Sequence, residues 1–263
     1  DWAELADYCT RSADPVGRML LRLHGDLSDE AAHAADGLCS ALQVLNHIQD
    51  AQDDRATLGR VYIPQSWMGD EESFFATATP QRRAVLDAML DRVEDWLDQA
   101  AALPRLCRNR RLAWQSAMTL ACARRLLARL RAADPLAGRV ALDKADFARA
   151  LLTPAPGDAA IVAARVKRAG SSFAAGMATL AGPRRRALWA VYAFCRAVDD
   201  IADGAMPEAE KRRFLSHWRE KLDDPDCALS RELAWARREY AIPRAECEAM
   251  IAGMETDAAD VLR

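Results

Sequence analysis

Apolar residues recur at three- and four-residue intervals along most of the chain, which is the spacing of one face of an α-helix. The stretch 85–100 shows the pattern, with Val, Leu, Met, Trp and Ala at this spacing. β-branched residues are sparse, whereas Ala, Leu and Arg are abundant, so intrinsic propensity favours helix as well. The pattern predicts an all-α fold.

Proline and capping residues divide this pattern into separate helices. Asp14-Pro15 separates two helical pieces within 2–24, because proline lacks an N–H group and biases the preceding residue away from helix. Ser28 fits the N-cap of a long helix that reaches Asp54, and Thr79-Pro80 fits the N-cap and first position of another. The remaining helices are expected over about 105–131, 144–152, 159–168, 183–204, 207–222, 230–240 and 243–263.

A short proline-rich stretch, Thr153-Pro154-Ala155-Pro156-Gly157, is the best candidate for a linker. We expect residues 153–158 to separate a segment at 1–152 from a segment at 159–263. With 263 residues and 29.0 kDa, the chain could form either one large helical domain or two smaller units.

Composition and charge exclude some classes of function. A net charge of -3 and a pI near 5.9 provide no global basic field, so nucleic-acid binding is not expected. Seven cysteines without a C-x-x-C pair indicate buried free thiols in a reducing cytoplasm. The sequence has no run of about 18 or more apolar residues, so a membrane-spanning helix is not expected.

The stretch 192–203 ends an apolar helical run with three carboxylates. Asp199 and Asp203 lie four residues apart and share a helix face, with Arg196 on the same side. Two carboxylates one turn apart offer the hard oxygen ligands that Mg²⁺ prefers, with water and substrate phosphate completing its shell. Paired acids on a helix are more often a solvated face, so one pair alone does not decide between these interpretations.

Asp50 and Asp54 repeat this spacing, again at the C-terminal end of a mostly apolar helix. Carboxylates there oppose the helix macrodipole at a cost of about 0.3–1 kcal/mol each unless a cation compensates, so positive charge is expected nearby. Two such faces across a cavity could hold several Mg²⁺ ions that grip a diphosphate. The segment 59–64 is expected to leave the helix in extended form, with Arg60 able to reach a phosphate.

The two stretches resemble the two aspartate-rich motifs of the squalene/phytoene synthases. Residues 192–203 resemble the first motif, and residues 46–54 with 59–64 resemble the second. Residues 1 to about 150 are similar to the C-terminal half of bacterial hydroxysqualene synthases, and residues from about 159 to 263 are similar to the N-terminal half of presqualene diphosphate synthases. Outside the motifs, the resemblance is carried by Tyr8-Cys9, Pro15-Val16-Gly17, Gly170-Ser171-Ser172-Phe173 and Gly253-Met254-Glu255-x-Asp257.

The order of the motifs is reversed relative to that family, in which the first motif precedes the second. Two explanations compete. The chain can be an internal piece of a fused pair of enzymes, or it can be a permuted synthase whose halves meet in space. We favour the first explanation, because the chain starts at Asp1 and its last expected helix runs up to Arg263.

The resemblance implies an isoprenoid-synthase-type helical bundle around a central cavity, with its halves in reversed order. It implies Mg²⁺ ligands at Asp50, Asp54, Asp199 and Asp203 and catalytic roles for Tyr8, Arg60 and Arg196. The substrate-binding residues implied in the same way are Asn46, Arg60, Tyr62, Ser171, Ser172, Phe173, Tyr192 and Arg196. Ordinary alternatives are a core position for Tyr8, a surface position for Arg60 and a helix cap for the two serines.

The implied activity is the Mg²⁺-dependent head-to-head condensation of two farnesyl diphosphates, through presqualene diphosphate, toward hydroxysqualene or squalene in hopanoid and other triterpenoid biosynthesis. A rival from another class is a non-catalytic helical remnant or scaffold that binds prenyl chains. The implied partner is farnesyl diphosphate, and the chain could also form a homodimer or pair with the missing halves. We expect a cytoplasmic protein, which could contact the inner face of the membrane because its substrates and products are apolar.

Overall fold

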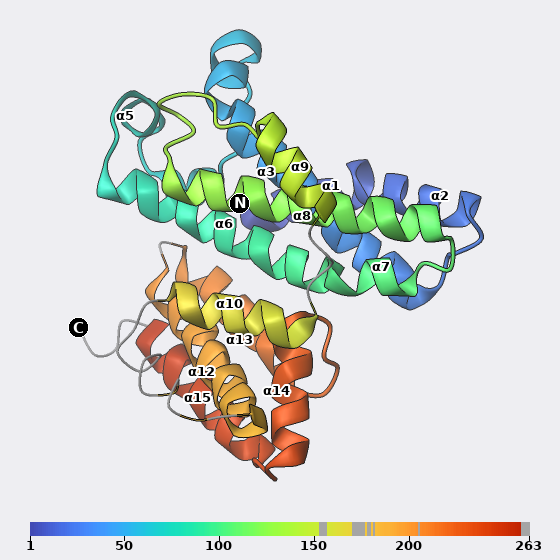
Figure 1. The fold of residues 1–263 in the computed structure, drawn as a ribbon. Coiled ribbons are helices and arrows are strands. Elements are labelled where there is room, and N and C mark those ends of the chain that lie inside the picture. Colours follow the sequence, from blue (N-terminus) through green and yellow to red (C-terminus); the bar gives the residue numbers. More distant parts are fainter. Residues whose placement is uncertain (153–156, 170–176, 178–179, 181, 205, 259–263) are drawn as a thin grey trace. The chain divides into compact units, whose positions relative to one another are not determined.

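The chain divides into two compact units, unit 1 at residues 1–155 and unit 2 at residues 156–263. The computed structural model describes residues 1–152, 157–169, 177, 180, 182–204 and 206–258 (Figure 1). All regular secondary structure in these ranges is helical, so the prediction of an all-α fold is confirmed. None of the described helices is both long and apolar enough to cross a membrane.

Unit 1 is organised around one long helix, α3 (Asp29–Leu58), which packs against α2, α6 and α8. In Figure 1, α6 and α8 lie side by side. The helices of this unit are α1 (Trp2–Ser12), α2 (Asp14–Leu23), α3, α4 (Gln65–Met68), α5 (Glu71–Ala76), α6 (Pro80–Gln99), a 3₁₀ turn (Ala100–Ala102), α7 (Leu103–Leu106), α8 (Arg110–Ala132) and α9 (Lys144–Leu152).

Local signals set both ends of α3. The Ser28 hydroxyl accepts the Ala31 N–H at 3.2 Å, which confirms the predicted N-cap. Gly59 ends the helix with φ 62°, a left-handed conformation that glycine adopts without steric cost. Between these ends α3 buries an apolar face that includes Val44, Leu45 and Ile48. The burial of this face directs the opposite face, which carries the acidic motif, toward solvent.

The N-terminal helices are fixed on this framework by aromatic stacking and a close helix contact. Trp2 stacks on Trp67 and Trp96, with ring centroids 5.6 and 5.3 Å apart. Gly17 lets α2 approach α3, since a Cβ atom there would lie 2.7 Å from Sγ of Cys39. These contacts determine where α1 presents its exposed side chains, Tyr8 among them.

One predicted helix boundary is wrong. The helix expected from about residue 105 begins at Arg110, because the Asn109 side chain accepts the N–H groups of Arg111 and Leu112 and caps the helix there. Pro104 lies instead in the separate short helix α7. The competing capping signal, rather than the apolar spacing, therefore decides the start of α8.

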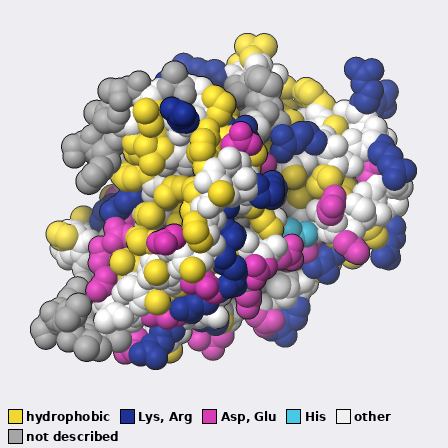
Figure 2. All heavy atoms as spheres, turned by 90° about the horizontal axis from the view of Figure 1, so that it is seen from below, with side chains coloured by type: hydrophobic (Ala, Val, Ile, Leu, Met, Phe, Trp, Pro, Cys, Tyr) yellow, Lys and Arg dark blue, Asp and Glu magenta, His cyan; other side chains and the backbone are white. Residues whose placement is uncertain are grey.

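Unit 2 is organised around α12 (Gly182–Asp203), which packs against α10, α13, α14 and α15. Its core includes Phe194, Val198, Leu215 and Trp218, with the Phe194 and Trp218 rings edge-to-face at 5.4 Å. The other helices described in this unit are α10 (Asp158–Arg168), α13 (Glu208–Lys221), α14 (Ala228–Glu239) and α15 (Arg244–Ala258). Acidic and basic side chains are interspersed on the face that Figure 2 shows, in keeping with the small net charge.

Two bidentate ion pairs tie the helices of unit 2 together. Arg186 of α12 binds Glu232 of α14 at 2.6 and 2.7 Å, and Arg231 of α14 binds Asp158 of α10 at 2.9 and 3.1 Å. Fork-to-fork pairs of this kind fix orientation as well as distance. They hold α12, and with it the acidic stretch 192–203, in a fixed frame within the unit.

Candidate functional site

The motif of unit 1 forms a stripe on the exposed side of α3. Asn46, Asp50 and Asp54 follow one another at four-residue spacing, with Asn46 exposed and the two aspartates half-buried. Ile48 and Ala51 lie between them in sequence and are buried, so the helix rotation separates the stripe from the core. The structure therefore places both predicted carboxylates of this motif on one accessible face.

Asp54 receives a hydrogen bond from the segment that follows its helix. The chain turns back after Gly59, and the Tyr62 hydroxyl donates to Oδ2 of Asp54 at 2.9 Å. Burial raises the pKa of Tyr62 and the bond to Asp54 raises it further, while the Arg60 guanidinium has the opposite effect. Tyr62 thus remains a protonated donor at neutral pH, and both it and Arg60 lie beside the motif as expected from the sequence.

Asp50 is paired with a residue that sequence reasoning missed. Arg139 lies 3.3 Å from Oδ1 of Asp50. The backbone on either side of Arg139 is held in place, because Gln49 donates to the Val140 carbonyl at 2.6 Å and Arg129 donates to the Ala141 carbonyl at 3.1 Å. No local sequence signal connects Arg139 with Asp50, since the contact joins positions far apart in the chain.

His47 is a second residue that sequence reasoning missed. Its ring is buried and stacks on Tyr62 with centroids 3.9 Å apart and an angle of 23° between the rings. Burial lowers the pKa of His47, although the carboxylates of Asp54 and Asp50 partly oppose this effect. The spacing of His47 to Asp50 and Asp54, three and seven residues, is a helical signal that could have revealed it.

Tyr8 reaches the same face from α1. Its ring centroid lies 5.9 Å from that of His47, and 47% of the residue is exposed. This exposure disagrees with the alternative that places Tyr8 in the core. Unit 1 therefore brings together the side chains of Tyr8, His47, Asp50, Asp54 and Tyr62.

The motif of unit 2 forms a corresponding stripe on α12. Tyr192, Arg196, Asp199 and Asp203 follow one another at four-, three- and four-residue spacing, and all are half-buried or exposed. Arg196 contacts Asp199 at 2.7 Å and Asp200 at 2.5 Å. Exposed ion pairs of this kind contribute about 0–1 kcal/mol, so Arg196 can exchange its carboxylate partners for a phosphate at small cost.

The C-terminal end of α12 receives positive charge from within the unit. The Lys211 ammonium group donates to the Ala202 carbonyl at 2.6 Å, next to Asp203. A cation on a terminal carbonyl offsets the negative end of the helix. Lys211 supplies part of this compensation from within the protein.

The other stretches that carry the family resemblance add no described residue to these two stripes. Ser171, Ser172 and Phe173 lie outside the described residues. Glu255 forms a bidentate pair with Arg219, which holds the pKa of Glu255 below its usual value, and Asp257 is exposed. Glu255 therefore contributes to packing between α13 and α15 within unit 2.

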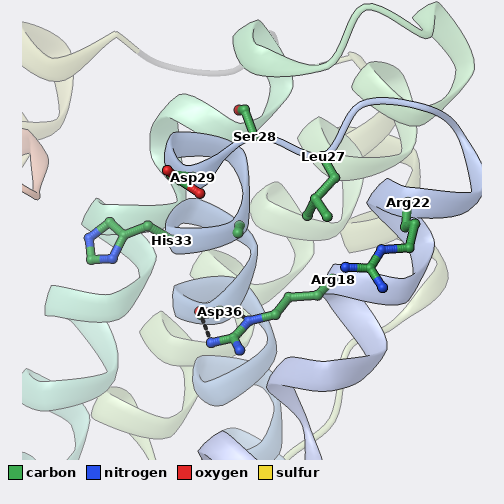
Figure 3. A pocket seen from close by; sticks show the side chains of 8 residues that line it. Arg18, Arg22, Leu27, Ser28, Asp29, His33 and Asp36 are labelled. Atoms are coloured by element: carbon green, nitrogen blue, oxygen red, sulfur yellow. Dashed lines mark hydrogen bonds and ion pairs between the residues drawn. The ribbon is translucent and has the colours of Figure 1, made fainter.

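A hollow of about 470 Å³ lies elsewhere on unit 1, between α2 and the start of α3 (Figure 3). Its lining consists of Arg18, Arg22, Leu27, Ser28, Asp29, Ala32, His33 and Asp36. Arg18 is held by Asp36 at 2.8 and 2.5 Å, and Asp29 adds a second negative charge. The hollow includes none of the motif residues, and its charges of both signs do not select one class of ligand.

Each motif offers too few ligands for a metal ion that is held by protein side chains alone, but its carboxylates fit Mg²⁺. Within the described ranges, no three His, Cys, Asp or Glu side chains lie close enough to hold a metal ion. Each motif offers two carboxylates one turn apart, with water-accessible surroundings. Mg²⁺ is commonly bound by one or two carboxylates, with water and substrate phosphate as the other ligands.

Comparison with known proteins gives the family. The sequence model of the squalene/phytoene synthase family matches residues 1–146 and 166–261. The chain is 37% identical over 147 residues to a hydroxysqualene synthase of Sinorhizobium fredii, covering 54% of this chain and 50% of that protein. It is 40% identical over 96 residues to a presqualene diphosphate synthase of Rhodopseudomonas palustris, covering 34% and 33% of the two chains.

Among solved structures, the chain is similar to the crystal structure of the squalene synthase HpnC from Alicyclobacillus acidocaldarius, with 38% sequence identity. The match covers 50% of this chain and 51% of that chain, with a TM-score of 0.45. The chain spans about half the length of the hydroxysqualene synthases it matches. The match of the family model covers most of the chain in two segments, and each segment carries one aspartate-rich motif. The chain belongs to the squalene/phytoene synthase family, whose members are prenyltransferases.

Proposed function

We propose that the chain takes part in the Mg²⁺-dependent head-to-head condensation of two farnesyl diphosphates, through presqualene diphosphate, toward hydroxysqualene or squalene. The observation that carries this proposal is that α3 and α12 each present two carboxylates one turn apart, with a basic side chain in contact. Unit 1 would correspond to the C-terminal half of a hydroxysqualene synthase and unit 2 to the N-terminal half of a presqualene diphosphate synthase.

In unit 1, Asp50 and Asp54 would hold the cation. Tyr62 engages Oδ2 of Asp54 and Arg139 engages Oδ1 of Asp50, so the second oxygen of each carboxylate would be available to the cation. Bound Mg²⁺ would neutralise the charge that develops on a departing diphosphate. Arg60, exposed beside Tyr62, would bind that diphosphate through its forked N–H donors.

In unit 2, Asp199 and Asp203 would hold the cation, and Tyr192 would contact the substrate from the same stripe. Arg196 would leave Asp199 and Asp200 and bind the diphosphate, an exchange that the exposure of these ion pairs makes inexpensive. Ser171, Ser172 and Phe173 would complete the substrate contacts.

The reaction needs two ionisations. In the first, a C–O bond of one farnesyl diphosphate breaks, diphosphate leaves, and the allylic carbon bonds to the double bond of the second molecule with loss of a proton. In the second, the resulting presqualene diphosphate loses its diphosphate, rearranges and adds water to give hydroxysqualene. Positively charged groups beside the leaving diphosphate would lower the barrier of both steps, and Tyr8, which is exposed, would take part in catalysis from the face that carries Asp50 and Asp54.

The rival function is a non-catalytic scaffold that binds prenyl chains. It is a rival because the chain matches only about half the length of the related hydroxysqualene synthase. Thermal unfolding in the presence of both Mg²⁺ and inorganic pyrophosphate distinguishes the enzyme from the scaffold. An enzyme site predicts stabilisation that Asp50→Asn and Asp199→Asn both weaken, whereas Glu30→Gln, at an exposed position of α3 outside the motif, leaves it unchanged. No stabilisation of the folded wild-type chain would support the scaffold and contradict the proposed function.

A further inference from the structure

We propose that His47 is a positioning residue, whose ring holds the Tyr62 phenol against Asp54 and thereby decides which carboxylate oxygen faces a cation. The inference rests on the proposed function only for its consequence at the cation. The placement of Tyr62 by His47 is a property of unit 1 itself and can be measured without any ligand.

The stack between the two rings is the first step of the argument. His47 is only 8% exposed and lies on the rigid helix α3, whereas Tyr62 lies in the non-helical segment between Gly59 and Pro64. The ring centroids are 3.9 Å apart and the rings are nearly parallel, at 23°. A side chain from a helix therefore provides the flat surface on which the side chain of a less regular segment rests.

His47 is itself held in one orientation. Its Nε2 lies 3.1 Å from the side-chain amide nitrogen of Gln43, one turn earlier on α3. The direction of this hydrogen bond depends on the tautomer of the imidazole, but the distance places the amide against the ring edge in either case. Gln43 thus fixes the imidazole, and the imidazole fixes the phenol.

The fixed phenol then determines the geometry of Asp54. The Tyr62 hydroxyl donates to Oδ2 at 2.9 Å, so Oδ1 would be the oxygen available to a ligand. Groups that orient a metal ligand from outside the coordination shell typically change metal affinity about 10–100-fold when removed. His47 is expected to act in this way through Tyr62.

Fluorine NMR of the chain labelled with 3-fluorotyrosine tests the placement directly. The chain has four tyrosines, and the Tyr62 signal is identified by its loss in Tyr62→Phe. We expect His47→Leu, which keeps apolar volume, to move the Tyr62 signal toward that of free fluorotyrosine, and His47→Phe, which keeps a ring, to leave it displaced. His33→Leu, an exposed histidine on the same helix, is the matched control and should change nothing.

An unmoved Tyr62 signal in folded His47→Leu would overturn the proposal, as would a shift of equal size in His47→Phe. Mn²⁺ with pyrophosphate, added to the wild type, then tests the proposed function separately, because a bound Mn²⁺ must broaden the Tyr62 signal. A sharp signal would contradict a cation site at Asp50 and Asp54 without affecting the conclusion on His47.

The coupling through Tyr62 can be measured as a double-mutant cycle by electron paramagnetic resonance of free Mn²⁺. We expect His47→Leu and Tyr62→Phe each to weaken Mn²⁺ binding about 10-fold and the double variant to weaken it no further. Multiplicative effects would show that His47 acts by another route and would overturn the positioning role. A change in thermal stability without a change in Mn²⁺ affinity would likewise show a purely structural role.

Discussion

Asp203 offers a prediction in which stability and ligand binding change in opposite directions. It is the exposed last residue of α12, so its negative charge lies at the negative end of the helix macrodipole. Removal of that charge in Asp203→Asn should stabilise the ligand-free unit by about 0.3–1 kcal/mol. For a domain of this size the gain corresponds to a rise in Tm of roughly 1–6 °C, reduced to the extent that Lys211 already offsets the dipole.

The same substitution should weaken binding of Mg²⁺ and pyrophosphate. A ligand at about 100 times its Kd stabilises the folded state by roughly 2.7 kcal/mol, and a tenfold weaker ligand at that concentration stabilises it by only about 1.4 kcal/mol. Thermal scans of the wild type and Asp203→Asn, with and without Mg²⁺ and pyrophosphate, measure both effects. The variant should start at a higher Tm and gain less from the ligands.

Glu239→Gln is the matched control, because Glu239 is also the exposed last residue of a helix in this unit, α14, and belongs to no motif. It should show the ligand-free gain with an unchanged response to Mg²⁺ and pyrophosphate. A lower ligand-free Tm in Asp203→Asn would show that Asp203 supports the fold. An undiminished ligand response would refute its assignment as a cation ligand.

Three further predictions follow from packing and charge. Gly17→Ala should destabilise the chain by about 1–3 kcal/mol in urea unfolding, because the new Cβ meets Sγ of Cys39, and Cys39→Ala in the same chain should restore much of the loss. Arg219 lowers the pKa of Glu255, so this ion pair stabilises the protein at pH values above the usual glutamate pKa. The stabilisation is lost as the pH falls through the lowered pKa of Glu255. Glu255→Gln should therefore flatten the decline of Tm on acidification. Burial raises the pKa of Cys9 and Cys39 to about 11, so neither thiol should react with iodoacetamide near neutral pH in the folded chain, and rapid labelling detected by mass spectrometry would contradict this.

Features set by neighbouring residues were predictable from the sequence. Ser28 marks the start of α3 and Gly59 marks its end, and Thr79-Pro80 marks the start of α6. Each of these signals acts within one helical turn. The two carboxylate stripes were predictable for the same reason, because helical spacing alone places Asp50 with Asp54 on one face.

Features set by distant residues were not predictable in this way. The contact of Arg139 with Asp50 depends on how the segment after α8 returns to α3, and the stack of His47 on Tyr62 depends on the turn at Gly59. The start of α8 was missed because the Asn109 cap outweighed an apolar pattern that extends further upstream. Spacing thus identified the candidate ligands, whereas their hydrogen-bonding partners required the folded chain.

Product analysis after incubation of the purified chain with farnesyl diphosphate and Mg²⁺ tests the proposed function most directly. We expect presqualene diphosphate or hydroxysqualene from the wild type and from Glu30→Gln, and neither product from Asp50→Asn or Asp199→Asn. Absence of both products with folded wild-type protein, or undiminished products in both of those variants, would contradict a prenyl-coupling site that uses the two aspartate-rich motifs.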